Sequence, residues 1–311
     1  MRAEPAAAAR ALLAWLAHPA LVALGMLASL ASAARLGPTL AVLLPVLGGV
    51  LAAVALERWM PYRRDWRAPR PQVLQDLLHN LVSTLGTSAV ARALAFATLP
   101  PAAIWLQQQV GAELWPARWP LPAQLALALT IKELPYYATH RWLHASALGW
   151  RLHELHHASE QLYSMSSGRT HPVNVFLTYG LPQVPLILLG APALVFTQVA
   201  VFMGIHGVLQ HSNVAFRYGW LSAVFATAEV HRHHHSRRLE ESGQNIGHNL
   251  MLWDHVFGTW CAPRTRGLEV GVEGAATPPS FWGQLVAPFT PGHDGRDATT
   301  SSPGRISRPA P

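Results

Sequence analysis

Histidines gather in the middle of this chain at spacings that suit a metal site. Fourteen of the 17 histidines lie between residues 140 and 255. Residues three or four apart share one face of a helix. Three sets follow that rule: His140 and His144; His153, His156 and His157; and His231, His234 and His235. His206 and His211 are five apart, which suits one face less well, so His211 is the stronger candidate unless a helix ends near Gly207.

The number of imidazoles favours two ions rather than one. A structural zinc site closes with four ligands and needs no more. The spacing does not choose the metal, because imidazole binds iron, zinc, copper and nickel. Ten candidate ligands beside a membrane instead indicate a redox pair of metal ions. They are His140, His144, His153, His156, His157, His206, His211, His231, His234 and His235.

The first two sets need a break in the chain before they can converge. His153 follows His144 by nine residues, or about two and a half helical turns, so one continuous helix would point them in opposite directions. We expect the break at residues 148–150, where the chain reads Leu-Gly-Trp.

The composition indicates that a membrane protein positions these histidines. Half of the residues are apolar and 13% are charged, against about 25% in a soluble domain. Segments of roughly 20 apolar residues can cross a bilayer. Four fit that length: residues 11–34, 40–56, 77–105 and 121–139. Residues 173–207 are apolar for too long to be one span and are broken by prolines and Gly190, so they predict a membrane hairpin or two short helices.

The arginines predict the orientation. Five lie between residues 57 and 75, whereas the connections on the opposite side hold only Arg35 and Arg118. The positive-inside rule places the N-terminus, this loop and the histidine sets in the cytoplasm. We expect the first apolar segment to be a retained helix, because it exceeds the apolar length of a signal peptide and a second span follows it.

Charge and cysteine content exclude several classes. The net charge of +7 comes almost entirely from arginines that flank apolar segments, which favours a membrane surface over nucleic acid. The single cysteine, Cys261, excludes a disulfide framework, a cysteine zinc site and a built-in iron–sulfur cluster. Any electron donor must therefore be a separate protein.

Taken together, the histidine runs resemble the fatty acid hydroxylase/sterol desaturase superfamily. The resemblance covers roughly residues 140–260, including the runs HRWLH, HELHH and HRHHH and the ending LWDHVFGT. It implies an integral membrane, non-haem di-iron enzyme. Such enzymes use O2 and electrons from a partner to hydroxylate, desaturate or otherwise oxidise lipids.

The resemblance also implies roles for individual residues. Nine histidines match the family's ligand positions, His206 matches less closely, and His255 stands where many relatives carry arginine. His171 fits a motif found in parts of the family, as a ligand, a supporting residue or a substrate-facing one. Apart from the resemblance, the positions of Glu133, Asn245 and Asp254 make them candidates to support the ligands, with ion pairing, turn formation or helix capping as the alternatives.

We therefore expect an all-α integral membrane protein with about four transmembrane helices and a cytoplasmic helical cap that holds two iron ions. Residues 1–139 form the transmembrane region, 140–265 the catalytic region with its hairpin, and 266–311 a tail that is disordered after about residue 289. The expected reaction is O2-dependent hydroxylation of a membrane lipid, with desaturation as the alternative. The lipid is left open among fatty acyl chains, sterol-like or hopanoid-like rings, carotenoids and ether lipids.

Two other classes compete with this prediction. A metal-binding or metal-transport protein would spread its ligands through the spans with carboxylates among them, and a relative without activity would lack a complete ligand set. We expect the enzyme to take electrons from a separate donor, such as a ferredoxin or a cytochrome, and we expect no nucleic-acid partner. We expect it in a bacterial inner membrane.

Overall fold

The computed structural model describes residues 4–264, 267–275 and 277–290. This part of the chain is helical, with three isolated β-bridges and no longer strand. The all-α prediction is therefore confirmed. The tail expected to be disordered after residue 289 lies, apart from Thr290, outside the described residues.

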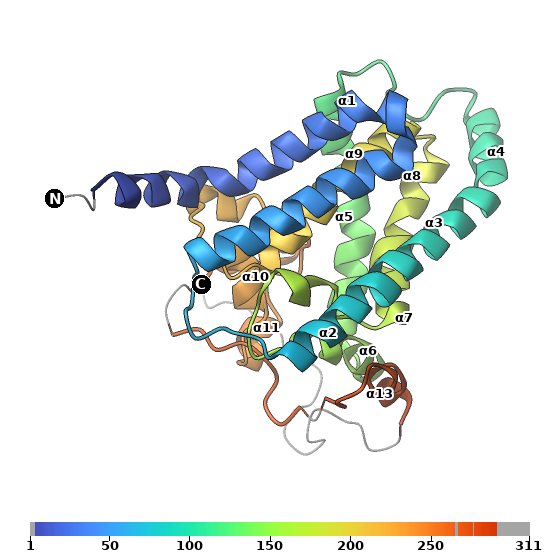
Figure 1. Cartoon of the computed structure of the whole chain (residues 1–311). Helices are drawn as coiled ribbons and strands as arrows, with labels where there is room; N and C mark the ends of the chain where they lie inside the picture. Colours follow the sequence, from blue (N-terminus) through green and yellow to red (C-terminus); the bar gives the residue numbers. More distant parts are fainter. Residues whose placement is uncertain (1–3, 265–266, 276, 291–311) are drawn as a thin grey trace.

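The first two apolar segments form one element, α1 (Glu4–Trp59), which doubles back on itself (Figure 1). The reversal comes at Gly37, whose φ of 74° and ψ of 166° lie outside the helical region. A positive φ is accessible to glycine at little cost, and Pro38 cannot continue the helical hydrogen bonds of the first half. The sequence thus separates α1 into two apolar rods.

The next helical run starts earlier than the sequence predicts. It comprises α2 (Arg70–Leu78), the π-helix η1 (His79–Gly86) and α3 (Thr87–Thr98), and it forms one long rod in Figure 1. The predicted span 77–105 does not continue straight, because Pro100 and Pro101 open a separate helix, α4 (Pro100–Val110). The rod is therefore 29 residues long, Arg70–Thr98.

Helix α5 (Leu121–Ala145) leads into the histidine region, and α9 (Ala193–His211) leads back to it. Between them, residues 172–188 form a run of short helical pieces: α7 (Pro172–Val175), η3 (Phe176–Gly180), η4 (Leu181–Gln183) and α8 (Val184–Leu188). A turn at Gly190, with φ of 78°, joins this run to α9. The structure thus has a helical hairpin where the prolines interrupt the sequence.

Three helices are long and apolar enough to cross a membrane: Ala7–Trp59, Arg70–Thr98 and Ala193–His211. The predicted span at residues 121–139 lies within α5, which does not meet this criterion, whereas α9 does. The difference arises because α5 carries buried polar side chains along its length, including Gln124, Lys132 and Glu133.

The core lies where α9 packs against both halves of α1. Val201, Ile205 and Leu209 are buried there against Ala14 and Ala53. Glycines bring the backbones close, because a Cβ on Gly49 would lie 3.0 Å from Ile205 Cγ1. Close approach through small residues is the usual way in which helices pack inside membranes.

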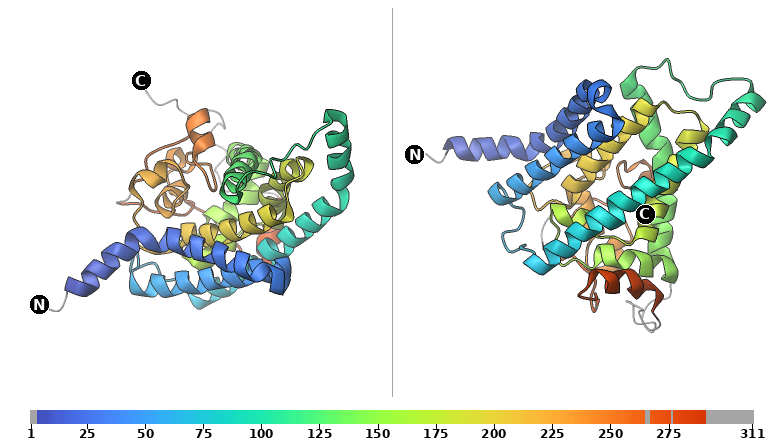
Figure 2. Two further views of the ribbon diagram at one scale, coloured as in Figure 1. Left: turned by 90° about the horizontal axis from the view of Figure 1, so that it is seen from above. Right: turned by 45° about the vertical axis from the view of Figure 1, so that its right-hand side comes forward.

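Shorter elements complete the described part of the fold. They are α6 (Ala147–His157), η2 (Ser164–Gly168), η5 (Gly219–Ala223), α10 (Ala228–His234), α11 (Leu239–Ser242), α12 (Leu252–Phe257), α13 (Phe281–Val286) and η6 (Ala287–Phe289). In Figure 1, α6, α10, α11 and α13 lie in its lower half, whereas the α1 reversal and the α4–α5 connection lie at its upper end. Figure 2 shows the N-terminal part of α1 projecting beyond the other helices.

Two glycines offer a matched test of the α1–α9 contact. A Cβ on Gly204 would lie 2.7 Å from Val46 Cγ2, whereas a Cβ on Gly48 would have nothing within 4 Å. We expect Gly204→Val to lower the free energy of unfolding by about 1–3 kcal/mol, because an overpacked contact strains its neighbours. Gly48→Val should change it by less than about 1 kcal/mol. Unfolding of the purified variants in detergent measures both, and equal effects would contradict this account of the packing.

Candidate metal centre

The chain changes direction between α5 and α6 at Ser146, so that histidines of both helices can face each other. This residue has an extended backbone, with φ of −111° and ψ of 146°, and its hydroxyl caps α6 by accepting a hydrogen bond from the Gly149 N–H (3.0 Å). The break was predicted at residues 148–150 and comes slightly earlier. Gly149 has a different role there, because a Cβ on it would lie 2.7 Å from the Trp142 carbonyl oxygen. The two helices can therefore fold closely together.

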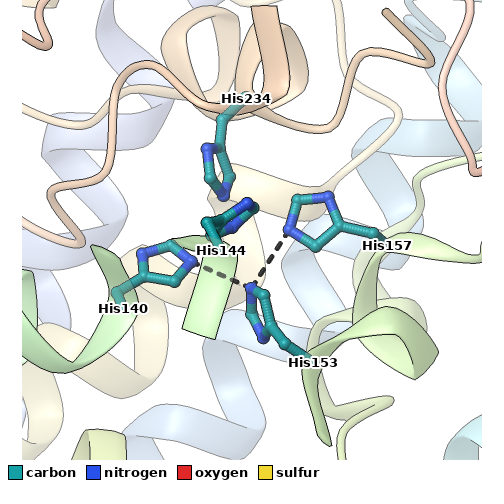
Figure 3. Close-up of side chains that lie close together, drawn as sticks. All are labelled: His140, His144, His153, His157 and His234. Atoms are coloured by element: carbon teal, nitrogen blue, oxygen red, sulfur yellow. Dashed lines mark hydrogen bonds between the residues drawn. The ribbon is translucent and has the colours of Figure 1, made fainter. Parts of the chain in front are cut away.

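Five histidines converge in what we call the five-histidine group. Figure 3 shows their rings turned toward a common centre. One nitrogen of each lies within 4.8 Å of the corresponding nitrogens of the others. All five side chains are buried. The members are His140 and His144 from α5, His153 and His157 from α6, and His234 from α10.

A second set, the four-histidine group, lies beside the first. It consists of His156 from α6, His211 from the end of α9, and His231 and His235 from α10 and its C-cap. The groups touch, because the rings of His157 and His235 are stacked with centroids 4.2 Å apart. Helices α6 and α10 each contribute to both groups, so the two candidate ion positions are neighbours.

The distances between ring nitrogens fit a shared ion. Two ligands bound at about 2.0–2.1 Å and about 90° apart lie roughly 2.9 Å from each other. In the five-histidine group, His153 Nε2 lies 2.9 Å from His140 Nε2 and 3.1 Å from His157 Nε2. In the four-histidine group, His231 Nε2 lies 2.8 Å from His211 Nε2 and 3.1 Å from His235 Nε2.

Backbone carbonyls fix the tautomer of three of these histidines. The Nδ1–H of His140 donates to the Ile246 carbonyl (2.6 Å), that of His234 to Gln244 (2.9 Å) and that of His156 to Arg169 (3.2 Å). Each bond leaves Nε2 as the unprotonated nitrogen, which is the form that binds a metal. His234 Nε2 is buried without a hydrogen-bond partner and faces the group.

Burial keeps these imidazoles neutral. It lowers the pKa of His156 to about 4, and it lowers the pKa of His153, His157, His231, His234 and His235 well below the ordinary value, with help from neighbouring imidazoles. Protons therefore compete weakly for the nitrogens near neutral pH. The donor set, its spacing and its protonation state all fit metal ions.

Comparison with known proteins agrees with this geometry. The profile of the fatty acid hydroxylase family matches residues 125–259, which include every member of both groups. The ornithine lipid hydroxylase OlsE of Rhizobium tropici is 35% identical over 246 residues, which cover 77% of this chain and 73% of that protein. The chain belongs to the fatty acid hydroxylase family.

Other relatives match over shorter regions. Human alkylglycerol monooxygenase is 29% identical over 48% of this chain and 33% of its own length. Methylsterol monooxygenase erg25B of Aspergillus fumigatus is 21% identical over 48% of this chain and 51% of its own length. No solved structure matches. Family membership makes the protein an oxidoreductase, as the sequence predicts.

The structure does not bring His206 to either group of this hydroxylase. Helix α9 runs without a break to His211, so the helix end considered near Gly207 is absent. His206 instead faces α1, where its Nδ1 lies 2.9 Å from His18 Nε2 and its ring stacks on Phe202. His18 in turn pairs with the Tyr218 hydroxyl (2.6 Å).

Two buried carboxylates hold the segment whose carbonyl orients His140. Asp254 accepts hydrogen bonds from the Ile246 and Gly247 N–H groups, both at 2.7 Å. Glu133 accepts from the His248 N–H and from the Asn249 N–H (2.8 Å). These contacts place both carboxylates behind the backbone that His140 touches, rather than against a histidine ring of either group.

The other two candidates for supporting residues lie elsewhere. Asn245 exchanges hydrogen bonds with the Cys261 backbone, accepting from its N–H (2.9 Å) and donating to its carbonyl (3.0 Å). His171 caps α7 by accepting from the Val173 N–H (3.1 Å) and donates to the Leu285 carbonyl (3.1 Å). His171 is in neither histidine group.

Sequence reasoning missed two supports that the fold provides. The Asn174 side-chain amide lies 3.0 Å from His153 Nδ1. Arg169, whose carbonyl accepts from His156, is itself paired with Asp76 of α2 (3.2 Å). Residues 169–172 read RTHP, the motif that contains His171, and the sequence predicts a role for His171 alone among them. No spacing in the sequence links Asn174 to His153.

Asn174 offers a test of this support. We expect Asn174→Ala to weaken metal binding by about 10- to 100-fold, because a partner that orients a ligand ring is lost. The matched control is Gln198→Ala, a buried amide in α9 that donates to Ser29. Metal retained during dialysis against a graded series of chelator concentrations measures the affinity. Equal retention by the two variants would remove Asn174 from the centre.

Proposed function

We propose that this protein is an O2-dependent hydroxylase of a membrane lipid, with one iron ion in each histidine group. The observation that carries the proposal is the convergence of nine imidazoles, eight of them buried, into two touching groups. Its family membership and its similarity to an ornithine lipid hydroxylase support lipid oxidation. A transporter would spread its ligands along its spans, whereas these ligands meet at one end of the bundle.

The protein's own residues hold and shield the reaction site. When bound, the irons supply the oxidation of an unactivated lipid C–H bond, with O2 as co-substrate and electrons from a separate donor. The five- and four-histidine groups hold the ions. The carbonyls of Ile246, Gln244 and Arg169 keep the coordinating nitrogens unprotonated. Burial of the rings excludes water from the site.

The substrate is proposed as a lipid that enters from the bilayer. By their names, the relatives described above act on an ornithine lipid, an alkylglycerol and a methylsterol. These three lipids share long apolar portions. In this chain, α1 and α3 present exposed leucines such as Leu12, Leu51 and Leu94 to their surroundings. Desaturation stays the alternative outcome, because it begins with the same removal of a hydrogen atom.

The proposed topology has four crossings and a hairpin. The two halves of α1, the α2–α3 rod and α5 cross the membrane, and residues 172–211 dip in and return to the ligand side. Residues 140–265 then form the catalytic cap on the cytoplasmic face of a bacterial inner membrane, and 1–139 the transmembrane region. The five arginines between residues 57 and 75 support this orientation. The donor is a separate ferredoxin or cytochrome.

One histidine from each group tests the metal assignment. Purified protein should carry about two irons per chain. His156→Ala and His234→Ala should each lower the iron content and reduce lipid oxidation by at least about 100-fold, because each removes a ligand.

His233→Ala is the matched control. It is adjacent to His234 and buried, but it lies outside both groups and its Nδ1 accepts from the Arg264 N–H. This variant should keep both iron and activity. Full activity in His234→Ala, measured by mass spectrometry of the lipid with reductant and O2, would exclude His234 as a ligand. An iron content near zero in wild-type protein from iron-replete cells would exclude the di-iron assignment.

Reporter fusions test the topology. A reporter fused after residue 264 should report a cytoplasmic position, and one fused after residue 114, in the α4–α5 connection, should report the opposite side. The reason is the arginine bias, which fixes the loop between α1 and α2 in the cytoplasm. A pair of alkaline phosphatase and fluorescent protein fusions at each site makes the measurement. A periplasmic signal after residue 264 would reverse the proposed orientation.

A further inference from the structure

A large basic cavity lies apart from the histidine groups. Its volume is about 1050 Å³, just above the roughly 300–1,000 Å³ typical of sites for organic ligands. Both ends of α1, the loop after it, and short segments at residues 163–165 and 213–217 form its walls. Six arginines line it: Arg10, Arg58, Arg63, Arg64, Arg67 and Arg217.

The charge of this cavity is strongly one-sided. Glu57 is the carboxylate in its lining, and it already accepts hydrogen bonds from the Ser164 N–H (2.6 Å) and the Asn213 N–H (3.0 Å). Asp65 pairs with Arg63 (2.5 Å). Guanidinium groups therefore outnumber these carboxylates six to two. Such a site attracts an anion, and arginine presents paired donors suited to phosphate or carboxylate.

The position of the cavity indicates a lipid rather than a soluble molecule. It opens between the two ends of α1, the most apolar candidate membrane helix. Ala11, Ala14 and Val54 give it an apolar wall on the helix side. Two of its lining residues are in contact: the Arg10 guanidinium lies over the Trp59 ring, 5.6 Å from its centroid. Arginine and tryptophan together are typical of the boundary between lipid tails and headgroups.

We propose that this cavity binds the anionic headgroup of a membrane lipid. The guanidinium groups hold the phosphate or carboxylate of the headgroup, and the acyl chains leave along the apolar surface of α1, where Leu12 and Leu51 are exposed. The proposal requires the chain to lie in a bilayer, but it does not require the metal centre to be active. Free phosphate shares the headgroup's chemistry, so the test separates the two sources.

The test compares lipid binding by two triple variants of the full chain in detergent. The cavity variant is Arg58→Gln/Arg64→Gln/Arg67→Gln. The control variant, Arg35→Gln/Arg92→Gln/Arg118→Gln, removes the same charge from residues outside the cavity. Native mass spectrometry measures binding of dioleoyl phosphatidylglycerol, which is anionic, and dioleoyl phosphatidylcholine, which is zwitterionic. Inorganic phosphate is added as a competitor.

Wild-type protein and the control variant should bind phosphatidylglycerol at least about tenfold more tightly than phosphatidylcholine, and the cavity variant should lose this preference. Three results would overturn the proposal: equal binding of both lipids by wild type, a preference retained by the cavity variant, or displacement of the lipid by inorganic phosphate at equimolar concentration. If the cavity variant does not fold, the salt dependence of lipid binding by the wild-type protein tests the proposal. Its preference should fall as NaCl rises from about 50 to 500 mM, and a preference independent of salt would also overturn the proposal.

Discussion

The structure depends on bringing nine imidazole rings together out of water. Burying a polar ring is costly unless it finds a partner, and two facing Nε2 atoms, such as those of His231 and His211 at 2.8 Å, can share at most one proton. Protonation does not remove this cost, because burial lowers the pKa of His231 and His235. A cation at the centre of each group would satisfy all the lone pairs at once. The fold is therefore organised around positions where positive charge is required.

Holding the rings in place depends on irregular backbone that is itself held by buried charges. The carbonyls of Ile246 and Arg169 orient one histidine in each group, and both belong to segments without regular helix. Asp254 fixes the first through backbone N–H donors, and Asp76 fixes the second through Arg169. A buried carboxylate is tolerated when several donors surround it. Asp76 belongs to α2, so a candidate membrane helix supports the four-histidine group through Arg169.

Sequence alone predicted the helical class, the apolar segments and nine of the histidines that the structure brings together, because helical periodicity is local. It placed the α5–α6 break too late, since Ser146 capping and the close approach at Gly149 are tertiary features. His206 was grouped with His211 by proximity in the chain, but an unbroken α9 turns it toward His18. Asn174 and Asp76 reach the centre only through contacts between distant segments, which no spacing rule contains. The ligand roles, as distinct from the grouping, stay a prediction.

Neither histidine group contains a carboxylate among the described residues, so the charge of ions bound there would have to be balanced in another way. Helix ends offer one. The last turn of α5 carries His144, that of α6 carries His156 and His157, that of α9 carries His211, and that of α10 carries His231 and His234. A helix C-terminus has a partial negative charge of roughly half an elementary charge. Four such ends lie beside the two groups, so the backbone itself would stabilise cations there without a charged side chain among the nine histidines. Unlike a carboxylate, the backbone carbonyls at a helix C-terminus do not take up a proton, so this compensation of charge does not vary with pH.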